Sequence, residues 1–258
     1  MLDRTRDGQV HVSSLLQAFP SKIGPMQKAT VITFDADGTL WDFRLVMRRA
    51  LSHVLVALRE AVPAPDAHAL TVDDMVAIRD EVAEEVQGQG VRLEEIRRLS
   101  FERILQRLGT HSEILTPHLT NVYFSHRFTN AGLYPDTRSA LDALRGHYRL
   151  GLISNGNSNP TRYGLAEHFE FTVNADDCGV AKPDAAFYQV VLERAGVSPG
   201  EVIHVGDSLV NDVQGAQSVG IHAVWLNRHG EVLPPAFHPD SVITVLTDLP
   251  PLLTRLGG

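Results

Sequence analysis

VITFDADGTLWD, residues 31–42, is the stretch that decides how this chain folds. Its first part, 31–34, is an apolar run rich in β-branched and aromatic side chains, which is typical of a central parallel strand buried on both faces. Gly38 and Thr39 then interrupt the run and start a turn. The segment therefore predicts a buried strand that ends in a polar loop.

Two aspartates, Asp35 and Asp37, mark the end of this predicted strand. Side chains two residues apart in an extended segment point to the same side, so both carboxylates can face one site. They repel each other unless a cation or a shared proton offsets the charge. The carboxyl ends of strands are also where open α/β sheets bind ligands. A polar exit from a strand explains a bare DxDG equally well, because Asp and Gly are common turn residues.

Three later segments, 152–157, 180–196 and 201–220, also place polar groups where a strand ends or a helix starts. Each is ordinary turn or helix-start chemistry when taken alone. Lys182 is one of only three lysines in a chain that otherwise uses arginine, and a compact ammonium can act as a point charge against phosphate or carboxylate. The four segments in this order favour one shared site. Its candidate members are Asp35, Asp37, Ser154, Asn155, Lys182, Gly206, Asp207 and Asp212.

In these motifs the chain resembles the phosphatase branch of the haloacid dehalogenase superfamily, over roughly residues 29–250. The DxDGT run at 35–39, the strand-end Ser154, Lys182 before a helix and a GD…D motif at 206–212 match the family pattern in order. The resemblance is specific for the superfamily and says little about the substrate.

The pattern outside the motifs predicts two parts. Apolar spacing predicts helices at 44–61, ended by Pro63 and Pro65, and at 71–87, 92–108 and 112–130, with no strand pattern between Phe43 and Gly132. Strands are expected near 149–154, 170–174, 202–206, 222–226 and 242–245. We predict an α/β fold, a doubly wound parallel sheet with an inserted all-helical cap domain. The expected division is an N-terminal extension at 1–28, a Rossmann-like core at 29–43 and 132–258, and the cap at 44–131.

The residues before Met26 show no element that the sheet requires, so we expect a chain that starts there to fold and stay active. The resemblance implies that the cap closes over the active site.

The resemblance also implies a role for each core residue. Asp35 is the expected nucleophile, which forms an aspartyl-phosphate and splits hydrolysis into two easier steps. Asp37 is suited to protonate the leaving oxygen and then to activate water. Ser154 and the Asn155 amide are expected to hold a phosphate oxygen, and Lys182 to neutralise nucleophile and phosphate.

A magnesium ion is the implied cofactor, because it prefers oxygen ligands and neutralises charge on a transferred phosphoryl group. The expected ligands are the carboxylates of Asp35 and Asp207 and the main-chain carbonyl of Asp37. Asp212 is expected to orient a metal-bound water or Lys182 instead of binding the ion directly.

The same residues discriminate among reactions of the superfamily. Dehalogenase members typically lack the second aspartate, so Asp37 favours phosphate chemistry, and a phosphonatase cap lysine is absent because 43–132 contains no lysine. We predict a phosphatase of a small phosphomonoester, with a sugar phosphomutase as the alternative, although Thr39 stands where mutases commonly carry Val or Ile. A non-catalytic phospholigand-binding protein is a further alternative. The stretch 182–228 resembles phosphatases of flavin mononucleotide or its ribityl phosphate precursor, and those of acylneuraminate and other sugar phosphates.

Composition limits the partners. The 258 residues carry a net charge of −8 with no large basic cluster, which argues against a nucleic acid partner. No apolar run approaches the roughly 20 residues of a membrane helix, and residues 1–28 lack a signal-peptide core. Cys178 alone gives neither a disulfide nor a zinc cluster. We expect a cytoplasmic monomer or dimer that acts on a small phosphorylated metabolite.

Cations and aromatic groups in and near the cap are the remaining candidates. For the cations we expect a solvated or ion-paired face, with binding of an anionic substrate as the alternative. Trp41 and Phe43 are expected to pack at the cap hinge, with stacking on a flat substrate as the alternative. His204, inside a predicted strand, is expected to be a core histidine. The cations are Arg44, Arg48, Arg49, Arg97, Arg98, His126 and Arg127.

Overall fold

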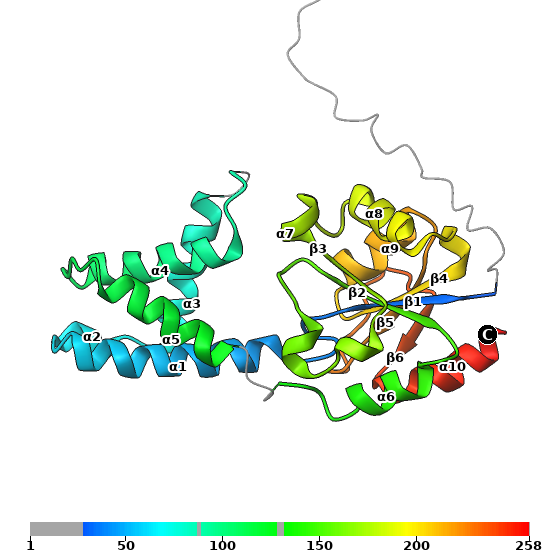
Figure 1. Cartoon of the computed structure of the whole chain (residues 1–258), viewed down its shortest axis with the longest axis horizontal. Helices are drawn as coiled ribbons and strands as arrows, with labels where there is room; N and C mark the ends of the chain where they lie inside the picture. Colours follow the sequence, from blue (N-terminus) through cyan, green and yellow to red (C-terminus); the bar gives the residue numbers. More distant parts are fainter. Residues whose placement is uncertain (1–27, 87–88, 128–131, 258) are drawn as a thin grey trace, which may run out of the picture.

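A sheet of six parallel strands in the order β3-β2-β1-β4-β5-β6 forms one part of the molecule (Figure 1). The computed structural model describes residues 28–86, 89–127 and 132–257, so the expectation about Met26 lies outside the described residues. All six predicted strands are confirmed, and this order with two outer helical layers is a doubly wound sheet. The strands are β1 (Val31–Asp35), β2 (Arg149–Ser154), β3 (Phe171–Asn174), β4 (Val202–Gly206), β5 (His222–Leu226) and β6 (Ser241–Ile243).

Alternation along β1 sends its side chains into two apolar clusters, one on each face of the sheet. Ile32 and Phe34 join the cluster under α6 (Thr137–Leu144) and α10 (Leu249–Leu256). Val31 joins the opposite cluster under α8 (Ala185–Ala195) and α9 (Gly215–Ser218), with α7 (Ala175–Cys178) beside it. Figure 1 shows these helices on opposite faces. Every residue of β1 is buried, as its apolar sequence predicts.

All-helical structure separates β1 from α6, and the described part of residues 43–127 contains no strand. The helices have their own apolar cluster, which includes Leu51, Met75, Phe101 and Tyr123, and this supports the predicted cap domain. Figure 1 shows the group extending away from the sheet. The inserted helices are α1 (Phe43–Ala61), α2 (Pro65–Ala69), α3 (Val72–Glu85), α4 (Leu93–Arg107) and α5 (Leu115–Arg127).

Helix boundaries in the cap follow local chemistry, with one difference from the expectation. Thr71 accepts a hydrogen bond from the Asp74 amide and so caps α3. Pro65 does not end a helix: α1 already ends at Ala61, and Pro65 opens α2 at a position that needs no amide hydrogen. None of the helices in the described ranges is long and apolar enough to cross a bilayer.

Candidate active site

The predicted site residues come together at the carboxyl ends of β1, β2 and β4. A cavity of about 260 Å³ lies there. Its lining also includes three residues that the sequence analysis did not single out, Gly156, Ser208 and Asn211, each next to a predicted motif residue or between two of them. The predicted residues that line it are Asp35, Asp37, Ser154, Asn155, Lys182, Asp207 and Asp212.

Lys182 is the buried cation of this cavity. Its Nζ donates to Asp35 Oδ1 at 2.6 Å and to Asp212 Oδ1 at 2.7 Å, and the residue is 4% exposed. Burial by itself lowers the pKa of Lys182, but the charges of Asp212 and Asp35 outweigh it and hold the pKa above its usual range. The side chain of Asn155 fixes the main chain of Lys182 through hydrogen bonds of 2.7 and 2.8 Å. Lys182 is therefore a preformed positive charge beside Asp35.

Asp212 bridges Lys182 to the buried core. It lies on a π-helical segment, Leu209–Gln214, which turns the carboxylate back toward β4. Its Oδ1 lies 3.1 Å from His204 Nε2, and its Oδ2 accepts from the Ser208 amide at 2.9 Å. Burial opposes the charge of Asp212, yet Lys182 and the hydrogen bond from His204 keep its pKa below the usual range. Both oxygens are thus engaged, which favours a role in orienting Lys182.

The expectation for His204 is confirmed, because its ring is fully buried and lies 3.0 Å from Thr33 Oγ1 through Nδ1. Burial lowers the pKa of this histidine and so favours the neutral ring. The close approach between β4 and the Asp212 segment also requires Gly206. A Cβ there would lie 2.2 Å from the Asp212 Cγ atom, closer than packing allows.

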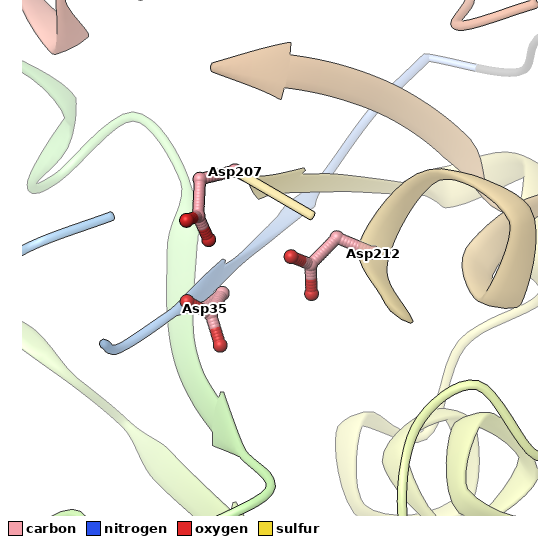
Figure 2. Close-up of side chains that lie close together, drawn as sticks. All are labelled: Asp35, Asp207 and Asp212. Carbon is pink, nitrogen blue, oxygen red and sulfur yellow. The ribbon is translucent and has the colours of Figure 1, made fainter. Parts of the chain in front are cut away.

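Three carboxylates, from Asp35, Asp207 and Asp212, point toward one another with single oxygens within 4.8 Å (Figure 2). Asp35 Oδ2 is buried and has no hydrogen-bond partner among the described residues. Burial and the neighbouring charges of Asp212 and Asp207 raise the pKa of Asp35 well above its usual value, despite Lys182. Burial and the charge of Asp212 raise the pKa of Asp207 to about 6. An orphaned oxygen among crowded carboxylates fits a hard divalent cation such as Mg²⁺.

Asp37 has surroundings unlike those of Asp35. Its Oδ1 accepts from the Trp41 indole at 2.5 Å, and Trp41 stacks on Tyr163 with ring centroids 4.0 Å apart. Burial raises the pKa of Asp37, partly offset by the charge of Arg127 and the Trp41 hydrogen bond. The packing role expected for Trp41 is confirmed. Tyr163 was missed because no local signal in the sequence links it to this motif.

Ser154 is the last residue of β2 and is followed by a tight turn. Its Oγ accepts from the Gly156 amide at 3.0 Å and lies 3.1 Å from Ser158 Oγ. Asn157, between Gly156 and Ser158 in this turn, donates to Glu94 Oε1 at the start of α4 across a distance of 3.2 Å. This loop therefore connects the catalytic edge of the sheet with the cap.

The expectation of solvated or ion-paired cations is confirmed for three cap residues. Arg44 is exposed, Arg48 forms an ion pair with Asp73, and Arg98 forms ion pairs with Glu95 and Glu102.

Solvation, one part of the expectation, is wrong for Arg97 and Arg127, which are 7% and 8% exposed. The Arg97 guanidinium lies 4.6 Å from the Tyr123 ring centroid, and that of Arg127 lies 4.4 Å from the ring centroid of Phe43. Aromatic faces from other helices thus cover both cations, which helical spacing alone does not reveal. Phe43, like Trp41, packs at the junction of cap and core as expected.

Comparison with known proteins shows which family the chain is similar to. A profile described as haloacid dehalogenase-like hydrolase matches residues 29–220. The chain is 29% identical to the 5-amino-6-(5-phospho-D-ribitylamino)uracil phosphatase YigB of Escherichia coli, over 81% of this chain and 88% of that protein. It is also 29% identical to the glyceraldehyde 3-phosphate phosphatase of Pyrococcus furiosus, over 90% and 96%.

A solved structure titled 2-haloacid dehalogenase, from Pseudomonas syringae pv. tomato, superposes with a TM-score of 0.74 at 31% identity. The superposition covers 88% of this chain and 99% of that one. The family profile spans most of the chain, including every candidate active-site residue. The chain therefore belongs to the haloacid dehalogenase-like hydrolase family and is an enzyme.

Proposed function

We propose that this enzyme is a Mg²⁺-dependent phosphatase that hydrolyses a small phosphomonoester through an aspartyl-phosphate on Asp35. The observation that carries the proposal is the second carboxylate: Asp37 lines the same cavity as Asp35 and Lys182. A leaving alkoxide needs a proton, whereas a leaving halide does not, so a second acidic group in the cavity fits phosphate ester cleavage. The two relatives named above as phosphatases support the same reaction class.

The first step is attack of an Asp35 carboxylate oxygen on phosphorus. Lys182 Nζ, 2.6 Å from Asp35 Oδ1, orients the carboxylate and offsets the negative charge of an incoming phosphate. Asp35, Asp207 and the main-chain carbonyl of Asp37 would hold Mg²⁺, which supplies positive charge to the crowded carboxylates and to the phosphoryl oxygens. Asp212 keeps Lys182 in place from its other side.

The phosphate is expected to lie near the turn that follows β2. The Ser154 hydroxyl can donate one hydrogen bond, and it accepts from the Gly156 amide, which leaves the hydroxyl proton for an anionic oxygen or for Ser158. The side chain of Asn155 is committed to the main chain of Lys182. Its contribution to phosphate binding is therefore expected from its main-chain amide.

For the substrate, the 260 Å³ cavity suits a phosphate and a small part of the group that carries it. We propose ribityl phosphates and sugar phosphates as the first candidates, since a relative that covers 81% of the chain is named for a phosphoribitylamino substrate. The rest of such a molecule would extend toward the cap, where Glu94 and Asn157 meet.

The test is release of inorganic phosphate from p-nitrophenyl phosphate and from a panel of metabolite phosphates, each with Mg²⁺ and with excess chelator. Asp35→Asn is the matched control, because the amide keeps the shape and loses the nucleophile. Parallel assays for halide release from 2-chloropropionate and for sugar-phosphate isomers cover the dehalogenase and mutase reactions. Halide release without phosphate release, or full phosphatase activity in chelator, would refute the proposal.

A further inference from the structure

The two oxygens of the Asp37 carboxylate have different surroundings. Oδ1 accepts from the Trp41 indole at 2.5 Å, and Trp41 is fully buried. Within the residues that the structure describes, this is the one hydrogen bond to the carboxylate. Oδ2 lies on the cavity side, since a Cβ added at Gly156 would be 3.6 Å from it and 3.4 Å from Ser154 Oγ. One oxygen is held and the other faces the site.

The indole is itself fixed on several sides. Tyr163 stacks on it with ring centroids 4.0 Å apart and planes 10° apart. The Trp41 carbonyl accepts from the Gly38 amide at 2.8 Å, and the Trp41 backbone also pairs with Leu133 on the return from the cap. Behind Tyr163, Arg127 at the end of α5 donates to the phenol oxygen at 3.3 Å. The indole N–H therefore stays directed at Asp37.

From this geometry, we propose that Trp41 is a positioning residue for proton transfer by Asp37. An indole N–H only donates, so the oxygen that it contacts must stay an acceptor. The proton of the neutral carboxyl is then carried by Oδ2, the oxygen that faces the cavity. This inference rests on the proposed phosphatase function and adds a residue that fixes the direction of its acid.

The proton balance of both steps follows from this assignment. In the first step, the bond from Asp35 to phosphorus forms, the ester P–O bond breaks, and the proton on Asp37 Oδ2 moves to the leaving oxygen. In the second step, Asp37 Oδ2 takes a proton from the attacking water while the phosphorus–Asp35 bond breaks. Inorganic phosphate leaves, Asp35 is restored as a carboxylate, and Asp37 is neutral again. Trp41 transfers no proton.

A purely structural role for Trp41 predicts a different result. A buried indole stacked on Tyr163 stabilises the core, and its loss would lower the melting temperature and reduce all activities together. A positioning role predicts a loss that depends on the leaving group, because p-nitrophenolate departs without protonation and an alkoxide does not. The ratio of the two losses separates these roles.

The experiment uses Trp41→Phe, which keeps an aromatic ring against Tyr163 and removes the N–H. We expect kcat to fall roughly 10- to 100-fold on glycerol 3-phosphate, as for a misdirected catalytic group, and by less than about threefold on p-nitrophenyl phosphate. In an Asp37→Asn background the same substitution should cause no further leaving-group-dependent loss. Circular dichroism at the assay temperature confirms that each variant is folded.

Two other variants keep the test decisive. Trp225→Phe is the matched control, because Trp225 donates an indole hydrogen bond of 2.8 Å to the Asp207 carbonyl, on the metal side of the cavity, and any loss there should be equal on both esters. Tyr163→Leu removes the ring behind Trp41 and should give a weaker form of the same leaving-group dependence. This variant answers the question if Trp41→Phe fails to fold.

The outcomes separate this inference from the proposed function. Equal losses on both esters for Trp41→Phe, or for Tyr163→Leu if Trp41→Phe does not fold, overturn the assignment of Trp41 while the native enzyme remains a phosphatase. The assignment of Trp41 is also overturned if, in the Asp37→Asn background, Trp41→Phe still lowers kcat more on glycerol 3-phosphate than on p-nitrophenyl phosphate by the same factor as in the native background. A native protein that releases phosphate from neither ester overturns the proposed function first, and the assignment with it.

Discussion

Replacing Lys182 by Met is expected to destabilise the core strongly in the absence of metal. Methionine has a similar length and no charge, so the change removes the cation and keeps most of the packing. The substitution leaves two buried carboxylate oxygens, on Asp35 and Asp212, without the donor that lies 2.6 and 2.7 Å from them. Asp212 keeps its bonds to His204 and the Ser208 amide, so most of the loss falls on Asp35.

The magnitude follows from these distances. At an effective dielectric constant of about 20, opposite charges this close attract by about 6 kcal/mol per pair before desolvation is subtracted. Burying Lys182 cancels much of that gain, and removing one partner of a buried pair typically costs about 3–5 kcal/mol. Protonation of Asp35, whose pKa is already raised, limits the loss to the lower part of this range. That is still a large share of the stability of an ordinary domain, about 5–15 kcal/mol.

Urea unfolding followed by tryptophan fluorescence measures this change, because both tryptophans, Trp41 and Trp225, lie in the core. Mg²⁺ should restore part of the lost stability in the Lys182→Met variant, since it supplies positive charge to the same carboxylates. The matched control is Arg103→Met, which removes a cation from the exposed pair with Glu85 and should have a much smaller effect. A free energy of unfolding within about 1 kcal/mol of the native value would refute the reasoning.

Three further predictions concern the reaction and the packing behind it. Asp35→Asn should abolish turnover, and beryllofluoride, a mimic of phosphoaspartate, should bind at Asp35; its binding at another residue would contradict the assignment of the nucleophile. Asp37→Asn should lower kcat by about 10²- to 10⁴-fold on an alkyl phosphate and by less on p-nitrophenyl phosphate. Asp207→Asn should weaken Mg²⁺ binding, measured by calorimetry, and lower turnover strongly. In the native enzyme Ca²⁺ should not replace Mg²⁺, and full activity with Ca²⁺ would contradict this expectation. Gly206→Ala should lower both melting temperature and activity, because its Cβ would displace Asp212, and a fully active, equally stable variant would show that the two segments can separate.

The sheet and the core of the site could be predicted from the sequence because both depend on short local patterns. A buried strand followed by a polar turn is readable in the residues themselves, and parallel strands bring their carboxyl ends to one edge whatever lies between them in the chain. Asp35, Ser154 and Asp207 therefore meet as expected, and Lys182 joins them from the loop before α8. Their catalytic roles stay predictions.

Contacts between distant segments could not be predicted in the same way. The charge of Arg97 favours the surface although its spacing from Phe101 and Ile104 places it on the buried face of α4, and only the position of α5 shows that Tyr123 covers it. The sequence predicts Trp41 as a packing residue, and the stacked ring of Tyr163 that fixes its direction comes from a short 3₁₀ helix, Pro160–Tyr163, beyond β2. No period or motif in one sequence specifies which side chains from separate elements will share a face.

The way the chain enters and leaves its helical insertion has a consequence for how the protein can be engineered. The Asp42 amide donates to the Gly132 carbonyl at 2.7 Å, so the segment that leads into the helical insertion lies next to the segment that returns from it. Residues 43–131 can therefore be replaced by a short Gly-rich bridge, or exchanged for the corresponding helices of a relative, without stretching the polypeptide at the splice. In such chimeras Asp35, Lys182 and Asp207 stay in place, whereas the contact of Arg127 with Tyr163 behind Trp41 is kept only if the new helices carry an equivalent cation.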